Sequence, residues 1–203
     1  MNEALLVVDL QKDFCSGGAL AVPDADAVIP LANQLMAQAS VCVITADWHP
    51  QSHASFAVNN VPGSRPGDEG QVGDIWQTLW PVHCVQGSDG AAFHPLLETD
   101  HADLILRKGY RRLLDSYSAF FENDRRTCTG LDGYLRARGV EAVAIIGLAL
   151  DYCVAWSAED ACRLGYATRV ILPACRAMQS GRALEQELEA LQRAGVQLVQ
   201  QMP

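Results

Sequence analysis

Six short runs of apolar residues recur along the chain, and most of them lack the polar alternation of a strand with one solvent-exposed face. Their enrichment in Val, Ile and Leu is typical of strands that are covered on both faces. The runs are residues 4–10, 41–48, 103–109, 142–149, 167–174 and 196–200. We therefore expect six buried strands.

Helical patterns fill most of the intervals between these runs. Apolar stripes at helical spacing mark residues 28–39 and 184–191, and Gly195 follows the second stripe as a helix stop. Shorter helices are expected over residues 129–139 and 151–165. Because strands that alternate with helices form right-handed βαβ units, the predicted fold class is α/β, with three layers (α/β/α) around a mostly parallel six-stranded sheet.

The segment from about residue 48 to residue 102 interrupts this alternation. It is rich in Gly and Pro and carries Trp76 and Trp80. Stretches of more than about 15 residues without secondary structure are uncommon in compact domains unless they serve a site. We interpret the segment as an active-site insertion within a single domain that spans residues 1–203.

Composition narrows the range of partners. A net charge of −9 from scattered acidic residues argues against nucleic acid and anionic membranes and favours a small neutral or cationic substrate. The apolar runs are far shorter than the roughly 20 residues of a membrane-spanning helix. The seven cysteines form an odd number without a CxxC pair, which indicates free thiols in a reducing compartment. We expect a soluble, cytoplasmic protein, and leave open whether it forms a homo-oligomer.

Reactive side chains follow the predicted strands. The first strand ends in Asp9, the second in Asp47 and His49, the third in Lys108, and the fourth continues into Cys153. Ligands of open parallel sheets bind beyond the carboxyl ends of the strands. The sequence therefore predicts a site at this edge that combines acids, an imidazole, a lysine and a thiol.

Each of these residues also has an ordinary structural interpretation. An acid such as Asp9 at a strand end is, on its own, more often a cap of a helix or turn, and an isolated Lys108 is more often solvated. A lone cysteine is usually a small apolar filler of the core. We keep that interpretation for Cys15, Cys42, Cys84, Cys128, Cys162 and Cys175.

Cys153 differs because of its place in the helix that follows. It lies off the apolar stripe of Val154, Ala158 and Ala161, in the first turn after Asp151, the expected N-cap. Free N–H groups and the positive end of the helix dipole favour a thiolate there, so we expect a pKa below the ordinary value of ~8.5. The same N–H groups can hold an oxyanion.

A thiol nucleophile also needs a base. Asp9 can accept the proton of Cys153, and Lys108 supplies a positive charge that stabilises both the carboxylate and the thiolate. Cysteine hydrolases more often use histidine as the base. The one histidine at a strand end, His49, is better placed as a metal ligand.

Carboxylate and imidazole groups indicate this metal site. Asp47 and His49 lie two residues apart, and the insertion offers His83. Three such ligands with open positions for water are typical of a catalytic site. His53 is an alternative fourth ligand or a residue that supports the ligands. We expect one divalent ion, with zinc as the first choice and iron and manganese as alternatives.

Five segments contain these residues. They are LLVVDLQKDFCSGGALAVP (5–23), ITADWHPQSHASF (44–56), WPVHCVQGSDGAAFHP (80–95), RKG followed by DSYSAFF (107–109 and 115–121), and GLALDYCV (147–154). Together they resemble the nicotinamidases (pyrazinamidases) of the isochorismatase-like cysteine hydrolase superfamily, over nearly the whole chain. Isochorismatases and carbamoyl-amide hydrolases of that superfamily share the Asp, Lys and Cys but generally lack the metal motif.

The resemblance implies a role for each reactive residue. It implies a catalytic triad of Asp9, Lys108 and Cys153, and a metal bound by Asp47, His49 and His83. It also implies hydrolysis of nicotinamide to nicotinate and ammonia through a cysteine thioester, in NAD salvage, with pyrazinamide as a further substrate. A related small-amide or carbamoyl-amide hydrolase is the alternative enzyme, and a metal-bearing binding protein is the alternative outside enzymes.

The resemblance also implies the surroundings of the substrate. Phe14 and Trp80, with Tyr117, would sandwich the flat pyridine ring. A cis peptide bond before Ala149 would aim its N–H, with the N–H of Cys153, at the oxyanion. Two features depart from the relatives: Leu150 replaces a small hydroxyl residue, and residues 110–114 (YRRLL) are unlike the corresponding segment.

Overall fold

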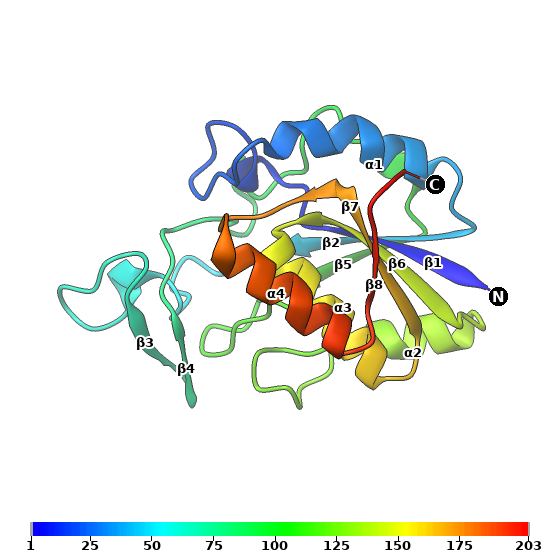
Figure 1. Cartoon of the computed structure of the whole chain (residues 1–203). Coiled ribbons are helices and arrows are strands. Elements are labelled where there is room, and N and C mark those ends of the chain that lie inside the picture. The colour runs from blue at the N-terminus through cyan, green and yellow to red at the C-terminus, as the bar shows by residue number, and fades with distance from the viewer. Residues whose placement is uncertain (1, 203) are drawn as a thin grey trace.

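The computed structural model describes residues 2–202 and contains the expected sheet. Six strands lie in the order β5-β2-β1-β6-β7-β8, and every neighbouring pair is parallel (Figure 1). The strands are β1 (Glu3–Val8), β2 (Val41–Asp47), β5 (Leu104–Lys108), β6 (Ala142–Leu148), β7 (Ala167–Arg176) and β8 (Gln197–Val199). Each predicted apolar run forms one strand, so the prediction of six strands and of the α/β class is confirmed. The expectation that all six are buried was wrong for β5 and β8, which lie at the two edges of the sheet and are partly exposed.

Helices cover both faces of this sheet. The helices are α1 (Val28–Met36), α2 (Leu131–Ala137), α3 (Ala155–Arg163) and α4 (Arg182–Arg193). Helix α1 lies on one face, and α3 and α4 pack against each other on the opposite face (Figure 1). Every residue of β2 and β6 is buried between these layers, which explains why their sequences are almost entirely apolar.

Short 3₁₀ turns lie in the connections between these elements. They are Lys12–Phe14, Ala25–Ala27, Ala57–Asn59 and Thr99–His101. The first turn follows β1 directly and carries Phe14 toward the carboxyl edge of the sheet. In the described residues, no helix is long and apolar enough to cross a membrane.

The insertion contains regular structure that the sequence analysis missed. Strands β3 (Glu69–Val72) and β4 (Ile75–Thr78) form an antiparallel hairpin that stands clear of the main sheet (Figure 1). Each strand has only four residues, and Gly70 and Gln77 occupy positions where alternation would place apolar side chains. The interpretation of this segment as structureless was therefore wrong, because its inward positions do not read as a strand pattern.

Gly147 brings the ends of β1 and β6 together beneath the site. Its φ is 117°, and a Cβ at this position would collide with the backbone of Val8. The register between β6 and β7 shifts between Ile145 and Gly147. Only a residue without a side chain allows this close approach. As a result, the residue after β1 and the turn after β6 face each other.

The cysteines occupy two kinds of environment. All seven are free, as predicted. The expectation of a buried filler was wrong for Cys128, which is exposed, and for Cys162, which is half-buried. Cys162 still packs against the core, but it lies near the end of α3, one position beyond the buried Ala161, and is only partly covered.

Candidate active site

The carboxyl ends of four neighbouring strands bring the predicted reactive residues together. Asp9 follows β1, Asp47 ends β2, and Lys108 ends β5. Cys153 lies in a single π-helical turn, Leu150–Val154, between β6 and α3. All four side chains are buried, and turns of this type occur often at functional sites.

The Lys108 ammonium stands at the centre of this group. Its Nζ lies 2.5 Å from Asp47 Oδ1, 2.8 Å from Asp9 Oδ2 and 3.4 Å from Cys153 Sγ. It also donates to the Ser116 carbonyl at 2.9 Å. Burial alone would lower the pKa of Lys108, but the two carboxylates raise it well above its ordinary value. Lys108 is therefore a fixed positive charge rather than a proton donor.

Asp9 has the properties of a base that can hold a proton. Its Oδ1 accepts a 2.6 Å hydrogen bond from Thr45 Oγ1. Burial raises the pKa of Asp9, Lys108 opposes that shift, and the negative charge of Asp47 adds to it. Asp9 adopts a φ of 50°, which is uncommon for a residue with a side chain, and its carboxylate is fully buried.

Cys153 differs from its prediction in two respects. Burial raises the pKa of its thiol well above the ordinary value, Lys108 offsets part of that shift, and Asp9 and Asp47 add to it. Asp151 is not its N-cap, because the carboxylate of Asp151 accepts the N–H groups of Met178 and Gln179 at 2.9 and 2.8 Å. The expected lowered pKa was therefore wrong: desolvation exceeds the effect of the turn, and the thiol needs a base to lose its proton.

The backbone before Cys153 has the geometry that the family resemblance implied. The peptide bond between Leu148 and Ala149 is cis. Ala149 and Cys153 both line the same pocket, while the Ala149 carbonyl accepts the N–H groups of Tyr152 and Val154 at 3.1 Å. The oxyanion role of the Ala149 and Cys153 N–H groups stays a prediction.

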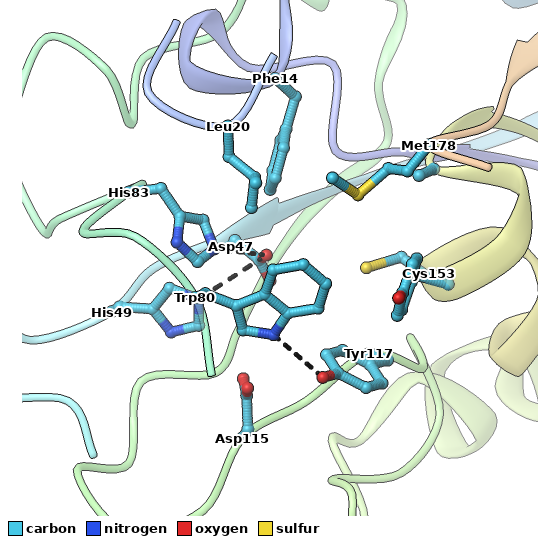
Figure 2. A pocket seen from close by; sticks show the side chains of 12 residues that line it. Phe14, Leu20, Asp47, His49, Trp80, His83, Asp115, Tyr117, Cys153 and Met178 are labelled. Carbon is cyan, nitrogen blue, oxygen red and sulfur yellow. Dashed lines mark hydrogen bonds and ion pairs between the residues drawn. The ribbon is translucent and has the colours of Figure 1, made fainter. Parts of the chain in front are cut away.

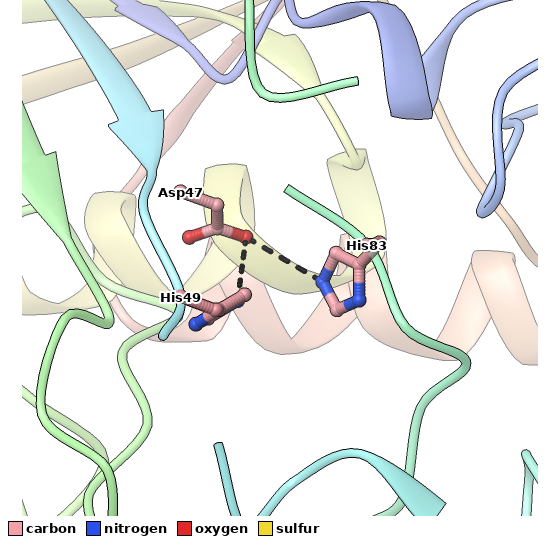
Figure 3. A group of neighbouring side chains, drawn as sticks. All are labelled: Asp47, His49 and His83. Carbon is pink, nitrogen blue, oxygen red and sulfur yellow. Dashed lines mark ion pairs between the residues drawn. The ribbon is translucent and has the colours of Figure 1, made fainter. Parts of the chain in front are cut away.

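Asp47, His49 and His83 form a compact donor set (Figure 3). The Nε2 atoms of His49 and His83 lie 3.7 and 4.0 Å from Asp47 Oδ2. Their Nδ1 atoms lie 2.7 Å from the Gly109 carbonyl and 2.8 Å from the Pro81 carbonyl. A carbonyl can only accept, so both Nδ1 atoms carry a hydrogen, and in the neutral rings both Nε2 atoms keep a lone pair for a metal.

This donor set fits a metal ion. Ligands of a tetrahedral ion with bonds near 2.1 Å stand about 3.4 Å apart, close to the two observed separations. Backbone carbonyls that hold the second ring nitrogen are the usual support of metal-bound imidazoles. Burial alone would lower the pKa of His49, but the Asp47 carboxylate raises it, whereas burial and the neighbouring His49 lower that of His83 to about 4.

His53 lies behind this set. Its ring centroid is 4.4 Å from that of His49, and its Nδ1 lies 2.7 Å from Ser55 Oγ. Its Nε2 is buried and has no hydrogen-bond partner among residues 2–202. A second group of potential ligand atoms combines His53 with His49 and Asp115. Since the free Nε2 of His49 faces Asp47, the two groups cannot both use it.

An aromatic pocket opens above Cys153 and the donor set (Figure 2). The structure places all three predicted ring-binding residues, Phe14, Trp80 and Tyr117, in its lining. Trp80 Nε1 donates to the Tyr117 hydroxyl at 3.0 Å, and the two rings are nearly perpendicular at 81°. Flat aromatic walls of this kind suit a planar heteroaromatic ligand.

Four other lining residues were missed by the sequence analysis: Leu20, Asp115, Tyr152 and Met178. Three of them lie inside the quoted segments, so the segments gave a signal that was not used. Met178 gave none, because the Asp151 carboxylate holds its N–H from 27 residues away. The two departures from the relatives lie outside the pocket lining found in the described residues: Leu150 is buried in the core, and residues 110–114 lie at the surface.

Glu122 gives the loop behind the pocket a pH-dependent stability. Its side chain is 1% exposed, and Oε1 lies 3.4 Å from Arg111 Nε. Burial raises the pKa of Glu122 to about 7, and Arg111 offsets only part of the shift. Since this folded-state pKa exceeds the unfolded value of ~4.3, the folded protein binds the proton more tightly. The free energy of unfolding therefore falls as pH rises between these values, and the loss is complete above pH 7.

We expect Glu122→Gln to raise the free energy of unfolding by about 2 kcal/mol at pH 8 and by much less at pH 5. Urea denaturation at both pH values measures the difference. Glu189→Gln, at an exposed position on α4, is the matched control and should change little at either pH. An equal effect of Glu122→Gln at both pH values would contradict the raised pKa.

Comparison with known proteins places this chain in one family. The isochorismatase domain family matches residues 3–201, and the chain belongs to that family. Within it, the chain is 48% identical to a nicotinamidase of Acinetobacter baylyi, over 98% of this chain and 92% of that protein. It is 46% identical to a nicotinamidase of Escherichia coli, over 85% and 82% of the two chains.

Solved structures agree with this placement. A nicotinamidase/pyrazinamidase of Acinetobacter baumannii superposes with a TM-score of 0.94 at 48% identity, covering 98% of this chain and 96% of that one. Yeast nicotinamidase bound to the inhibitor nicotinaldehyde gives 0.91 at 31% identity, over 98% and 100%. A pyrazinamidase of Pyrococcus horikoshii in complex with zinc gives 0.80 at 33% identity, over 99% and 100%.

Proposed function

We propose that this protein is a nicotinamidase, which hydrolyses nicotinamide to nicotinate and ammonia in NAD salvage and also accepts pyrazinamide. The observation that carries the proposal is the contact of Lys108 with both Asp9 and Cys153, whose side chain lines an aromatic pocket. Relatives named nicotinamidase, at 46–48% identity over most of their length, support it. The whole chain, residues 1–203, would act as one domain.

The proposed reaction begins with a proton transfer. Asp9 takes the proton of Cys153, and the thiolate attacks the amide carbon while the N–H groups of Ala149 and Cys153 receive the negative charge on oxygen. Asp9 then returns the proton to the amide nitrogen, and the C–N bond breaks to release ammonia. Water, with Asp9 as base, hydrolyses the thioester on Cys153 to nicotinate.

The raised pKa values of Asp9 and Cys153 suit this sequence. A buried carboxylate with a raised pKa is a stronger base than an exposed one, and the thiol keeps its proton until a substrate is bound. Lys108 keeps its charge throughout, so it stabilises whichever of the two groups is ionised. During these steps the pyridine ring of the substrate would be held by Phe14, Trp80 and Tyr117.

Asp47, His49 and His83 would hold one divalent ion, and zinc is our first choice because a similar pyrazinamidase was solved with zinc. The converging Nε2 atoms and the carbonyl-bound Nδ1 atoms support this assignment. A bound ion would supply a ligand position for the ring nitrogen of a pyridine. If the protein were instead a carbamoyl-amide hydrolase, it would not need this set of three metal ligands.

Free thiols and the net negative charge support the remaining proposals. We expect a cytoplasmic protein, because all seven cysteines are free. A small amide is the expected partner rather than nucleic acid or a membrane, because the net charge is −9.

The direct test is ammonia release from nicotinamide by the purified protein. We expect turnover of nicotinamide and pyrazinamide, and turnover of benzamide that is slower by about 100-fold or more, because benzamide lacks the ring nitrogen and loses its orientation. A coupled ammonia assay measures all three. Turnover of maleamate or a carbamoyl amide in the absence of nicotinamide turnover would favour the alternative enzyme.

The metal content of single variants should distinguish the three proposed ligands from His53. We expect His49→Ala and His83→Ala to retain less than about a tenth of the zinc of the wild-type protein and of its turnover, since each removes one of three ligands. His53→Ala is expected to keep most of both. Elemental analysis of the purified proteins measures the metal. Equal metal loss in all three variants would make His53 a ligand.

A further inference from the structure

The hairpin of the insertion delivers one polar side chain to the back of the aromatic pocket. Gln77 is the buried residue of β4, whereas its neighbour Trp76 is 68% exposed. Gln77 Nε2 donates to Asp115 Oδ2 at 2.7 Å and lies 3.4 Å from the Tyr117 hydroxyl. A hairpin that stands clear of the main sheet therefore makes hydrogen bonds to two lining residues of the pocket.

Asn123 completes the network from the other side. Asn123 Oδ1 accepts the backbone N–H of Tyr117 at 2.8 Å, and Asn123 Nδ2 donates to Gln77 Oε1 at 2.9 Å. Its own N–H donates to the Asp115 carbonyl at 2.7 Å. Gln77, Asp115 and Asn123 are each at least 93% buried, so water does not compete for these bonds.

One backbone group determines which atom donates and which accepts in every hydrogen bond of this network. The N–H of Tyr117 can only donate, which fixes Asn123 Oδ1 as the acceptor and Nδ2 as the donor toward Gln77. Gln77 must then present Oε1 to Asn123 and both hydrogens of Nε2 to Asp115 and the Tyr117 hydroxyl. The network begins at the backbone of Tyr117 and returns to its side chain.

The Tyr117 hydroxyl connects this network to the pocket wall. It accepts a hydrogen bond from Trp80 Nε1 at 3.0 Å (Figure 2). The direction of this bond is fixed, because an indole N–H can only donate. With Gln77 on its other side, the hydroxyl lies between two donors. Its position fixes the ring of Trp80, which packs edge-to-face on Tyr117 and Tyr152.

We propose that Gln77 is a positioning residue that holds Tyr117 and Trp80 in the orientation that binds the flat ring of the substrate. The identity of the substrate rests on the proposed function, whereas the hydrogen-bond network does not depend on it. Gln77 contacts neither Cys153 nor Asp9, so it acts on binding of the ring and leaves bond cleavage unchanged. Its loss raises KM and not kcat.

The test compares Gln77→Met with Gln71→Met. The first variant keeps the length of the side chain and removes all its hydrogen bonds. The second makes the same change on β3 of the same hairpin, where Gln71 is exposed and donates only to the Gly73 carbonyl at 3.0 Å. We expect Gln77→Met to raise KM for nicotinamide about tenfold, with kcat within about twofold and zinc content unchanged. Gln71→Met keeps the wild-type KM.

Asn123→Asp tests the same network without changing its packing. The new carboxylate still accepts the N–H of Tyr117 but cannot donate to Gln77 Oε1. Gln77 then reverses its amide and turns its oxygen toward Asp115, which loses its donor. We expect the same rise in KM as for Gln77→Met, although Gln77 is still present. A wild-type KM in both variants would overturn the proposal, as would a fall in kcat with loss of zinc at unchanged KM.

An NMR readout separates this inference from the proposed function. The indole ¹H–¹⁵N signal of Trp80, assigned by its absence in Trp80→Phe, should shift and exchange faster with solvent in Gln77→Met and Asn123→Asp, but not in Gln71→Met. This result needs no substrate. Wild-type protein that releases no ammonia would refute the proposed function alone, whereas an unchanged Trp80 signal would refute the positioning role alone.

Discussion

Replacement of Cys153 by Ala is expected to reduce ammonia release from nicotinamide by a factor of about 10⁴ or more, because no other group can form the thioester. The sulfur of Cys153 lines the pocket, lies within 4.8 Å of a carboxylate oxygen of the proposed base Asp9, and is 3.4 Å from Lys108 Nζ. Its raised pKa has a consequence for this test. Activity should depend on Asp9 as strongly as on the thiol itself.

Mass spectrometry of the intact protein checks the mechanism directly. After rapid quenching with nicotinamide or a slow analogue, the wild-type protein should carry a nicotinoyl group on Cys153, and Cys153→Ala should carry none. Cys162→Ala, on the helix that follows, should keep both the adduct and the turnover, since Cys162 lies outside the pocket lining. No adduct in the wild type, with substantial activity in Cys153→Ser, would indicate direct attack by water.

The sheet was predictable because burial on both faces leaves a signature in the sequence. Strands β2 and β6 are buried at every position, so their sequences are almost entirely apolar. Since parallel strands share one carboxyl edge, the places of Asp9, Asp47 and Lys108 followed from the topology alone. The fold therefore determined which side chains meet, even though Asp9 and Lys108 lie 99 residues apart in the sequence.

Electrostatics and long-range hydrogen bonds were not predictable in the same way. The sequence pattern around Cys153 indicates a helix start, but whether its thiol is acidified depends on how much water and negative charge surround it. Asp151 reads as an N-cap, yet its partners are 27 and 28 residues further along the chain. Gln77 reads as a surface residue of a polar segment, because nothing local reveals that β4 turns it toward Asp115.

Lys108 gives the second large expected effect, because it holds two buried carboxylates and the thiol together. Lys108→Met keeps the volume of the side chain but leaves Asp9 and Asp47 without their common cation. We expect turnover to fall by a factor of about 10³ or more. Lys12→Met, which breaks a surface ion pair with Asp89, is the matched control and should leave turnover unchanged.

The free energy of unfolding of Lys108→Met should also depend on pH, in a direction that follows from the charges around Lys108. In the wild-type protein, burial alone would raise the pKa of Asp47, but Lys108 and the two imidazoles lower it below its ordinary range. Without Lys108 the folded-state pKa values of Asp9 and Asp47 rise, so the folded variant binds protons that the unfolded chain releases. Its free energy of unfolding should therefore fall as pH rises above ~4, by about 3 kcal/mol more than in wild type at pH 8. Thermal denaturation of metal-free protein at pH 5 and pH 8 measures this difference. An equal loss at both pH values would show that the two carboxylates do not depend on Lys108 for their charge.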